Sequence, residues 1–304
     1  MIALEYELPL VVEIKRNALD DGPGIRTTIF FKGCPLSCVW CQNPESIKIY
    51  PEIAYSPGDC LLCGACEEAC PEGAIDLKRR PQPVDRQRCT RCGTCTTVCP
   101  GKGMRLVGRH YPVAELAEIV AEDSIFYENS GGGVTLSGGE PTMHPRYLKP
   151  FLQALKFNRI HVNLETCGYY YRPVFERYIL PYLDLIYYDI KLIEPDAHRR
   201  YTGRTNDRIL ENFEALIRGG KVPFLPRIPL IPGVTDTDEN LAGIASFLNK
   251  MGVKRTALLP YNPLWLPKAE NLDRQSSYQY DRWMTPEEIE RCASHFDHFE
   301  LEEF

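Results

Sequence analysis

Eight of the thirteen cysteines in this 304-residue chain fall in two runs with the same spacing, and this repeat constrains the fold most. Each run reads C-x2-C-x2-C-x3-C-Pro, and each cysteine of the second run lies 29 positions after its counterpart (60 to 89, for example). So short a segment holds little apolar core, so we expect bound metal to hold it together. The cysteines are Cys60, Cys63, Cys66 and Cys70, then Cys89, Cys92, Cys95 and Cys99.

This spacing is that of bacterial two-cluster ferredoxins, in which the fourth cysteine of each run binds the other cluster. Four-cysteine zinc knuckles are the alternative, although a C-x3-C before proline is unusual in zinc sites. We therefore expect residues 50–105 to form a ferredoxin-like insert between residues 1–49 and 106–304. The predicted ligands are Cys60, Cys63, Cys66 and Cys99 for one [4Fe–4S] cluster, and Cys70, Cys89, Cys92 and Cys95 for the second.

Three further cysteines, Cys34, Cys38 and Cys41, lie on one short loop between Gly33 and Pro44. Three thiolates this close can hold three irons of a four-iron cluster, whereas an electron-transfer cluster takes four cysteines. An open coordination position is how a metal site keeps room for a substrate. A zinc loop or three structural thiols are the alternatives, but neither accounts for the motifs downstream. Cys167 and Cys292 lack such spacing, and we expect them to be small buried hydrophobic residues.

Composition and charge indicate which partners and which cellular compartment to expect for this chain. A net charge of −6 and a pI near 5.6 argue against nucleic acid or an acidic membrane as partner. The N-terminal residues lack the features of a signal peptide, and no apolar run is long enough to span a membrane. Many cysteines without a secretory signal indicate metal ligation in a reducing compartment. We expect a cytoplasmic protein that must be handled without oxygen.

Strand and helix patterns alternate along the rest of the chain. Stretches with helical spacing, such as Val113–Val120, Tyr147–Phe157 and Asp238–Lys250, separate the strands, so right-handed crossovers and a parallel sheet are expected. An earlier apolar run, Leu8–Ile14, predicts one more strand. Six strands after it predict an α/β fold: a partial, TIM-like (β/α)6 barrel carrying the insert. These strands are 26–31, 133–141 (which ends in a glycine turn), 160–166, 183–191, 222–231 and 255–260.

Ligands of parallel α/β folds collect at the C-terminal ends of the strands. In this chain the unusual residues gather at those predicted ends, which is unlikely by chance for six strands. After the cysteine loop they are Gly138, Gly139, Glu140 and Pro141, then Glu165 and Thr166, Asp189 and Lys191, Arg227 within the fifth strand, and finally Asn262.

The cysteine loop also carries a family resemblance. Cys34-x3-Cys38-x-Trp40-Cys41 resembles the signature of the radical S-adenosylmethionine (SAM) enzymes. Asp21-Gly-Pro-Gly-Ile-Arg-Thr27 and the Phe-Phe-Lys-Gly before Cys34 are similar to one branch, the activating enzymes of glycyl radical enzymes. The match runs from about residue 10 to about residue 262. Because of the insert, the chain resembles the pyruvate formate-lyase-activating-enzyme-like branch with two additional clusters rather than the shorter activators.

The resemblance implies SAM contacts. Gly138, Gly139, Glu140 and Pro141 match the segment that binds the methionine amino group in this superfamily. Trp40 matches a residue near the adenine. Lys191, of Asp189-x-Lys191, matches the lysine that meets the SAM carboxylate, although an ordinary ion pair is the alternative. Arg227 and Asn262 match further SAM contacts, with Asn262 standing where many relatives have histidine.

Two further implications concern a cation and the partner. Glu165, Thr166 and Asp189 together resemble a monovalent-cation site, with Glu165 standing where that branch has aspartate. Asp21 matches an aspartate near the glycine of the partner protein, although an aspartate before glycine is commonly a turn former.

The implied function is reductive cleavage of SAM to a 5′-deoxyadenosyl radical, which takes the α-hydrogen of a glycine in a partner glycyl radical enzyme. Three [4Fe–4S] clusters and SAM would be the cofactors, with a flavodoxin- or ferredoxin-type protein as electron donor. The insert would relay electrons, although docking of the electron donor, docking of the partner and a purely structural remnant are the alternatives. The rival functions are a radical SAM enzyme that modifies another peptide or a small molecule, and an electron-transfer protein.

Overall fold

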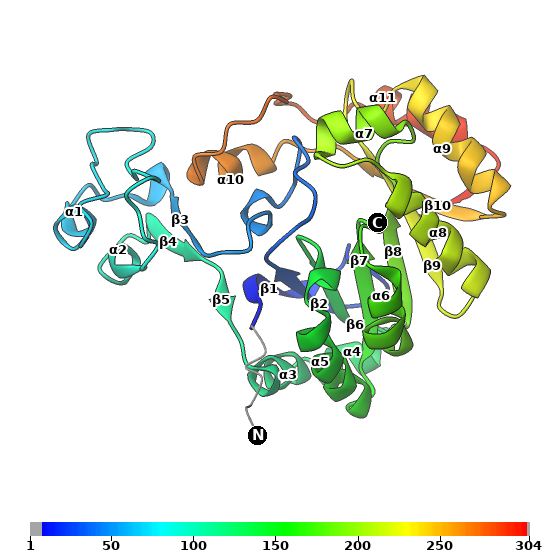
Figure 1. Ribbon diagram of the computed structural model, residues 1–304, viewed down its shortest axis with the longest axis horizontal. Coiled ribbons are helices and arrows are strands. Elements are labelled where there is room, and N and C mark those ends of the chain that lie inside the picture. Colours follow the sequence, from blue (N-terminus) through cyan, green and yellow to red (C-terminus); the bar gives the residue numbers. More distant parts are fainter. Residues whose placement is uncertain (1–7, 303–304) are drawn as a thin grey trace.

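The computed structural model describes residues 8–302 and is built around a nine-stranded sheet (Figure 1). The strand order is β11-β10-β9-β8-β7-β6-β2-β1-β5. All neighbours from β2 to β11 run parallel, whereas β1 is antiparallel to both β2 and β5. The strands are β1 (Leu10–Ala18), β2 (Arg26–Phe31), β5 (Arg109–His110), β6 (Gly133–Gly138), β7 (His161–Thr166), β8 (Leu185–Asp189), β9 (Phe224–Leu230), β10 (Arg255–Pro260) and β11 (Glu300–Leu301).

The predicted fold class is confirmed. The six expected strands are β2 and β6 to β10, and the expected extra strand is β1. The sheet is open, with β5 and β11 at its two edges, as a partial barrel requires. β11 adds a seventh parallel strand that was not predicted from the sequence, because a strand of two residues is too short to show alternating apolar and polar positions.

Helices occupy the crossovers, and Figure 1 shows α3, α5, α6, α8 and α9 following one another along the sheet. Thr237 caps α9 by accepting a bond from the Asn240 N–H, and Thr285 begins α11 with a capping box. The helices are α3 (Val113–Ala121), α4 (Ser124–Ser130), α5 (Pro145–Phe157), α6 (Arg172–Tyr178), α7 (Pro195–Thr202), α8 (Asp207–Gly219), α9 (Asp238–Lys250), α10 (Trp265–Asn271) and α11 (Pro286–Ala293).

The two faces of the sheet differ in chemistry, because successive side chains of a strand point to opposite sides. One face contributes buried aliphatic residues, among them Leu136, Leu164 and Ile186, to the main core beneath the helices. The other face carries polar side chains in register: Thr135 beside Asn163, and Ser137 and Glu165 two positions further along their strands. The polar face therefore leads toward the strand ends at which ligands were expected.

The insert has a small fold of its own. β3 (Glu52–Tyr55) pairs antiparallel with β4 (Met104–Val107), so β4 runs two residues past the predicted end of the insert. Two short helices, α1 (Ala65–Glu68) and α2 (Thr94–Thr97), lie between them, and a separate hydrophobic cluster fills the space. Figure 1 shows this unit projecting at the end of the molecule opposite β10. Within residues 8–302 no helix is long and apolar enough to cross a membrane.

Candidate active site at the strand ends

The three-cysteine loop is anchored to the glycine-rich turn after β6 by backbone hydrogen bonds. The Glu140 N–H donates to the Gly33 carbonyl at 2.8 Å, and the Gly139 N–H donates to the Phe31 carbonyl at 2.8 Å. A Cβ atom on Gly139 would lie 2.1 Å from the Gly33 oxygen, so only glycine allows this approach. The two motifs that sequence analysis singled out are thus held together at the ends of β2 and β6.

Cys34, Cys38 and Cys41 are half-buried on this loop. Burial raises the pKa of Cys38 above its ordinary value and that of Cys41 to about 12, while the nearby Lys191 ammonium opposes both shifts. Bound iron would reverse this, because a coordinating thiol is deprotonated. Three mutually close thiols with one lysine nearby therefore fit a cluster that is held by three ligands.

The Glu140 side chain is fully buried, and its carboxylate accepts bonds from several groups of the protein. One oxygen, Oε1, accepts from the Thr142 hydroxyl at 2.7 Å and the Thr142 N–H at 3.2 Å, and the other accepts from the Cys167 N–H at 2.8 Å. The Thr166 hydroxyl lies 2.9 and 3.0 Å from the two oxygens. The carboxylate thus fixes the end of β7 against the glycine turn.

A second carboxylate, that of Asp189, lies between two cations. Its Oδ2 is 3.0 Å from the Lys191 Nζ, and its Oδ1 is 2.9 Å from the Arg227 Nη2. Burial raises the pKa of Asp189, but the two cations outweigh burial and hold that pKa below its usual value. Burial likewise lowers the pKa of Lys191, and the nearby negative groups, Asp189 foremost, raise it above the ordinary value. The predicted Asp189-x-Lys191 pair therefore exists and stays charged.

The other predicted residues are spread around this centre. Asn262 contacts the cysteine loop, since its carbonyl accepts a bond from the Gln42 side chain at 3.2 Å. Trp40 is buried beside Tyr201, with ring centroids 6.4 Å apart. Asp21 lies on the polar face at the level of Thr28, whose hydroxyl donates to its Oδ2 at 2.7 Å.

The eight cysteines of the insert line two cavities, divided as the ferredoxin spacing predicted. Cys70, Cys89, Cys92 and Cys95 line one of them. The other four, Cys60, Cys63, Cys66 and Cys99, line the second. Within residues 8–302 no group of three or more His, Cys, Asp or Glu side chains is arranged to hold a single metal ion. Four thiols around one cavity fit a four-iron cluster, in which each cysteine binds a different iron.

Comparison with known proteins decides the family. The model of the radical SAM superfamily matches residues 82–245, and that of the 4Fe-4S dicluster domain matches residues 59–104. The chain is 40% identical over 299 residues to the trans-4-hydroxy-L-proline dehydratase activating enzyme of Clostridioides difficile, covering 95% of this chain and 98% of that one. It is a radical SAM activating enzyme of glycyl radical enzymes.

Two further relatives have the same kind of name. The isethionate sulfite-lyase activating enzyme of Nitratidesulfovibrio vulgaris is 40% identical over 273 residues, covering 88% of each chain. The indoleacetate decarboxylase activating enzyme of Tractidigestivibacter scatoligenes is 36% identical over 293 residues, covering 92% of this chain and 91% of that one. This activating enzyme therefore binds SAM and iron–sulfur clusters, cleaves SAM to generate a radical, and has a glycyl radical enzyme as its partner.

Cys167 is the residue at this site that sequence reasoning missed. The expectation that it is buried is confirmed, as it is for Cys292. Its thiol, however, lies against Cys34 of the cluster loop, and this contact together with burial raises the pKa of Cys167 well above its ordinary value. Its position directly after Glu165-Thr166 at a predicted strand end was the only signal that could have indicated this.

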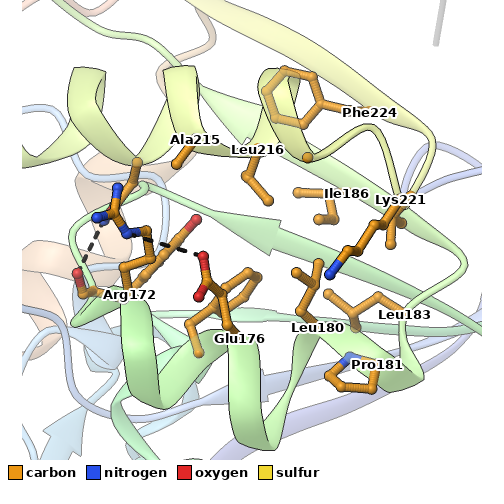
Figure 2. Close-up of a pocket in the computed structure, with 15 residues that line it drawn as sticks. Arg172, Glu176, Leu180, Pro181, Leu183, Ile186, Ala215, Leu216, Lys221 and Phe224 are labelled. Carbon is orange, nitrogen blue, oxygen red and sulfur yellow. Dashed lines mark hydrogen bonds and ion pairs between the residues drawn. The ribbon is translucent and has the colours of Figure 1, made fainter.

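The activating enzyme also has an open pocket away from the strand ends. It lies between α6 and α8, has a volume of about 420 Å³ and is walled by apolar residues such as Leu180, Leu216 and Phe224 (Figure 2). Arg172 and Glu176, 3.9 Å apart, lie at one side of it. Its lining comes from the helix-covered side of the sheet, so it is separate from the site of the cysteine loop.

Proposed function

We propose that this activating enzyme holds three [4Fe–4S] clusters and uses the strand-end site to bind SAM at the first of them. Cys34, Cys38 and Cys41 would hold the SAM cluster, and the two cavities of the insert would hold the others. Residues 50–105 would form the cluster-bearing insert, and residues 1–49 and 106–304 the partial barrel. The observation that carries the proposal is the direct bonding of the cysteine loop to the turn at Gly139 and Glu140.

A reduced [4Fe–4S] cluster held by Cys34, Cys38 and Cys41 would supply the electron for cleavage of the sulfur–C5′ bond of SAM. The residues of the chain bind and orient. Lys191, held by Asp189, would meet the SAM carboxylate as a charge-assisted donor. Gly138, Gly139, Glu140 and Pro141 would receive the amino group, since the glycines permit close approach and the buried Glu140 carboxylate holds this turn against the end of β7.

The remaining contacts follow the same logic. Arg227 would also face the SAM carboxylate, because three of its five N–H groups account for its contacts with Glu165 and Asp189. Trp40 and Asn262 would lie beside the nucleoside. Asp21 would approach the partner glycine from the polar face of the sheet, and a flavodoxin- or ferredoxin-type protein would deliver electrons through the insert.

The test is anaerobic reconstitution followed by addition of SAM and dithionite. We expect about 12 irons per chain, from three four-iron clusters, and production of 5′-deoxyadenosine. Cys38→Ala should abolish the product and remove one cluster of iron. Cys292→Ala, which removes a buried cysteine outside all three ligand sets, should retain both. A Cys38→Ala protein that still cleaves SAM would overturn the proposal.

A further inference from the structure

The carboxylates of Glu165 and Asp189 face a cation that belongs to the chain itself. The Arg227 guanidinium lies between them, with Nη1 2.6 Å from the Glu165 Oε1, and Nη2 and Nε 2.9 and 3.0 Å from the Asp189 Oδ1. Arg227 is 7% exposed, so these contacts are largely shielded from water. This is the place where the family resemblance implies a monovalent metal ion.

The other oxygens of the two carboxylates are bonded as well. The Glu165 Oε2 accepts from the Ser137 hydroxyl at 2.5 Å, and the Asp189 Oδ2 lies 3.0 Å from the Lys191 Nζ. All four carboxylate oxygens therefore have donors within the protein. The Asp189 Oδ1 accepts two bonds and has no lone pair left for an ion, and an ion at the Glu165 Oε1 would compete with the Arg227 guanidinium.

The hydroxyl of Thr166, the third predicted ligand, is engaged in other hydrogen bonds. It donates to the Glu140 carboxylate and accepts a bond from the Gly168 N–H at 3.0 Å. With its proton and one lone pair engaged, this buried hydroxyl has a single lone pair left for an ion.

Before SAM binds, the charges of these four paired side chains balance without a metal ion. Glu165 and Asp189 supply two negative charges, and Arg227 and Lys191 supply two positive ones. A further cation at this buried place would lie close to the guanidinium, and repulsion between like charges is strong where water is excluded. The residues present therefore do not fit a monovalent metal ion.

We infer that Arg227 is the built-in counter-ion of this site and that the enzyme binds SAM without a monovalent metal ion. Besides facing the SAM carboxylate, Arg227 positions Asp189 and through it Lys191. This inference rests on the proposed function only in taking SAM affinity as a readout. A second readout, the thermal unfolding of the protein without SAM, does not depend on it.

The experiment compares potassium, sodium and tetramethylammonium chloride at equal ionic strength, using the anaerobically reconstituted enzyme. We expect the SAM dissociation constant to stay within about two-fold and the unfolding midpoint to stay constant, because a cation that binds only the native state would raise that midpoint. Tighter SAM binding or a higher midpoint in potassium or sodium would overturn the inference. If SAM fails to bind at all, the proposed function fails while the unfolding data still decide the cation question.

Variants sharpen the test. Arg227→Met removes the guanidinium and exposes both carboxylates, so its midpoint should become higher in potassium than in tetramethylammonium. Arg227→Lys keeps the positive charge, so its unfolding midpoint should be the same in potassium as in tetramethylammonium. Arg282→Met, which breaks an exposed pair with Glu288 at 2.7 Å, is the matched control and should show no ion dependence. If Arg227→Met does not fold, the wild-type comparison alone decides.

Discussion

Lys32 and Glu52 form a buried ion pair, with the Lys32 Nζ 2.7 Å from the Glu52 Oε2, that joins the main sheet to the insert. Lys32 follows β2 and precedes the cysteine loop, whereas Glu52 is the first residue of β3. The same carboxylate accepts from Arg274 on both oxygens, at 2.9 and 2.7 Å. One side chain of the insert thus contacts both the strand that leads to the cluster loop and the segment after α10.

Replacing Glu52 with glutamine should destabilise the protein by about 3 kcal/mol, because removing one partner of a buried pair leaves the other charge uncompensated. Lys32 is fully buried, and burial already lowers its pKa below the ordinary value. Denaturant unfolding of the reconstituted enzyme measures the loss. Glu115→Gln, which breaks the exposed pair with Arg109, should cost at most about 1 kcal/mol. Equal losses in the two variants would contradict the prediction.

Gly139→Ala should disrupt the cluster loop. The added methyl would lie 2.1 Å from the Gly33 oxygen and 2.7 Å from the Ser46 oxygen. Both are backbone carbonyl oxygens, which cannot rotate away as a side chain can. We expect the variant to lose the iron of the SAM cluster, by iron analysis and electron paramagnetic resonance, while the insert keeps its clusters. Gly219→Ala is the control, because a Cβ there meets no atom within 4 Å and alanine favours the helix by up to about 1 kcal/mol. A Gly139→Ala protein with full iron would refute this account.

Much of this site was predictable because parallel strands bring their C-terminal ends to one edge whatever their distance in sequence. That rule placed Glu165 and Asp189 together, and the ferredoxin spacing divided the eight cysteines as the two cavities do. The contacts themselves were not predictable. Arg227 pairs with carboxylates 38 and 62 residues away, and a sequence cannot show that a guanidinium lies between them.

Cys167 and the helices α4 and α10 were missed because the local sequence carries no pattern that indicates them. Cys167 has no cysteine neighbour in sequence, so only the packing of β7 against the cluster loop brings it to Cys34. The helices α4 and α10 have seven residues each, too few for a helical period to stand out from the loops beside them.

The protein should lose stability as the pH falls below about 6.5, partly through His144. This histidine lies against the strand before the cluster loop, with Nε2 2.8 Å from the Lys32 carbonyl oxygen, and burial lowers its pKa below the ordinary 6.5. Below pH 6.5, His144 therefore takes up a proton more readily in the unfolded chain than in the folded one. Its contribution to the free energy of unfolding is complete above pH 6.5 and is lost as the pH drops through that value. Burial lowers the pKa of His161 and His198 in the same direction.

His144→Gln should flatten this dependence. We expect a smaller difference between the free energies of unfolding at about pH 7 and about pH 5.5 than in the wild type, because one of the three groups no longer titrates. Replacing the exposed His110 with glutamine is the matched control and should leave the slope unchanged. The role assigned to His144 is wrong if both variants show the wild-type slope.

The relay through the insert can be tested at Cys63 and Cys92, the exposed cysteines of the two cavities. Alanine at both positions should remove or damage both clusters of the insert while leaving Cys34, Cys38 and Cys41 intact. A relay requires 5′-deoxyadenosine formation with reduced flavodoxin to fall to a small fraction of the wild-type rate. Dithionite, a small reductant that can reach the SAM cluster directly, should still support cleavage, and SAM affinity should persist. If flavodoxin drives the variant as fast as the wild type, the insert serves docking or structure, because electrons then reach SAM without its clusters.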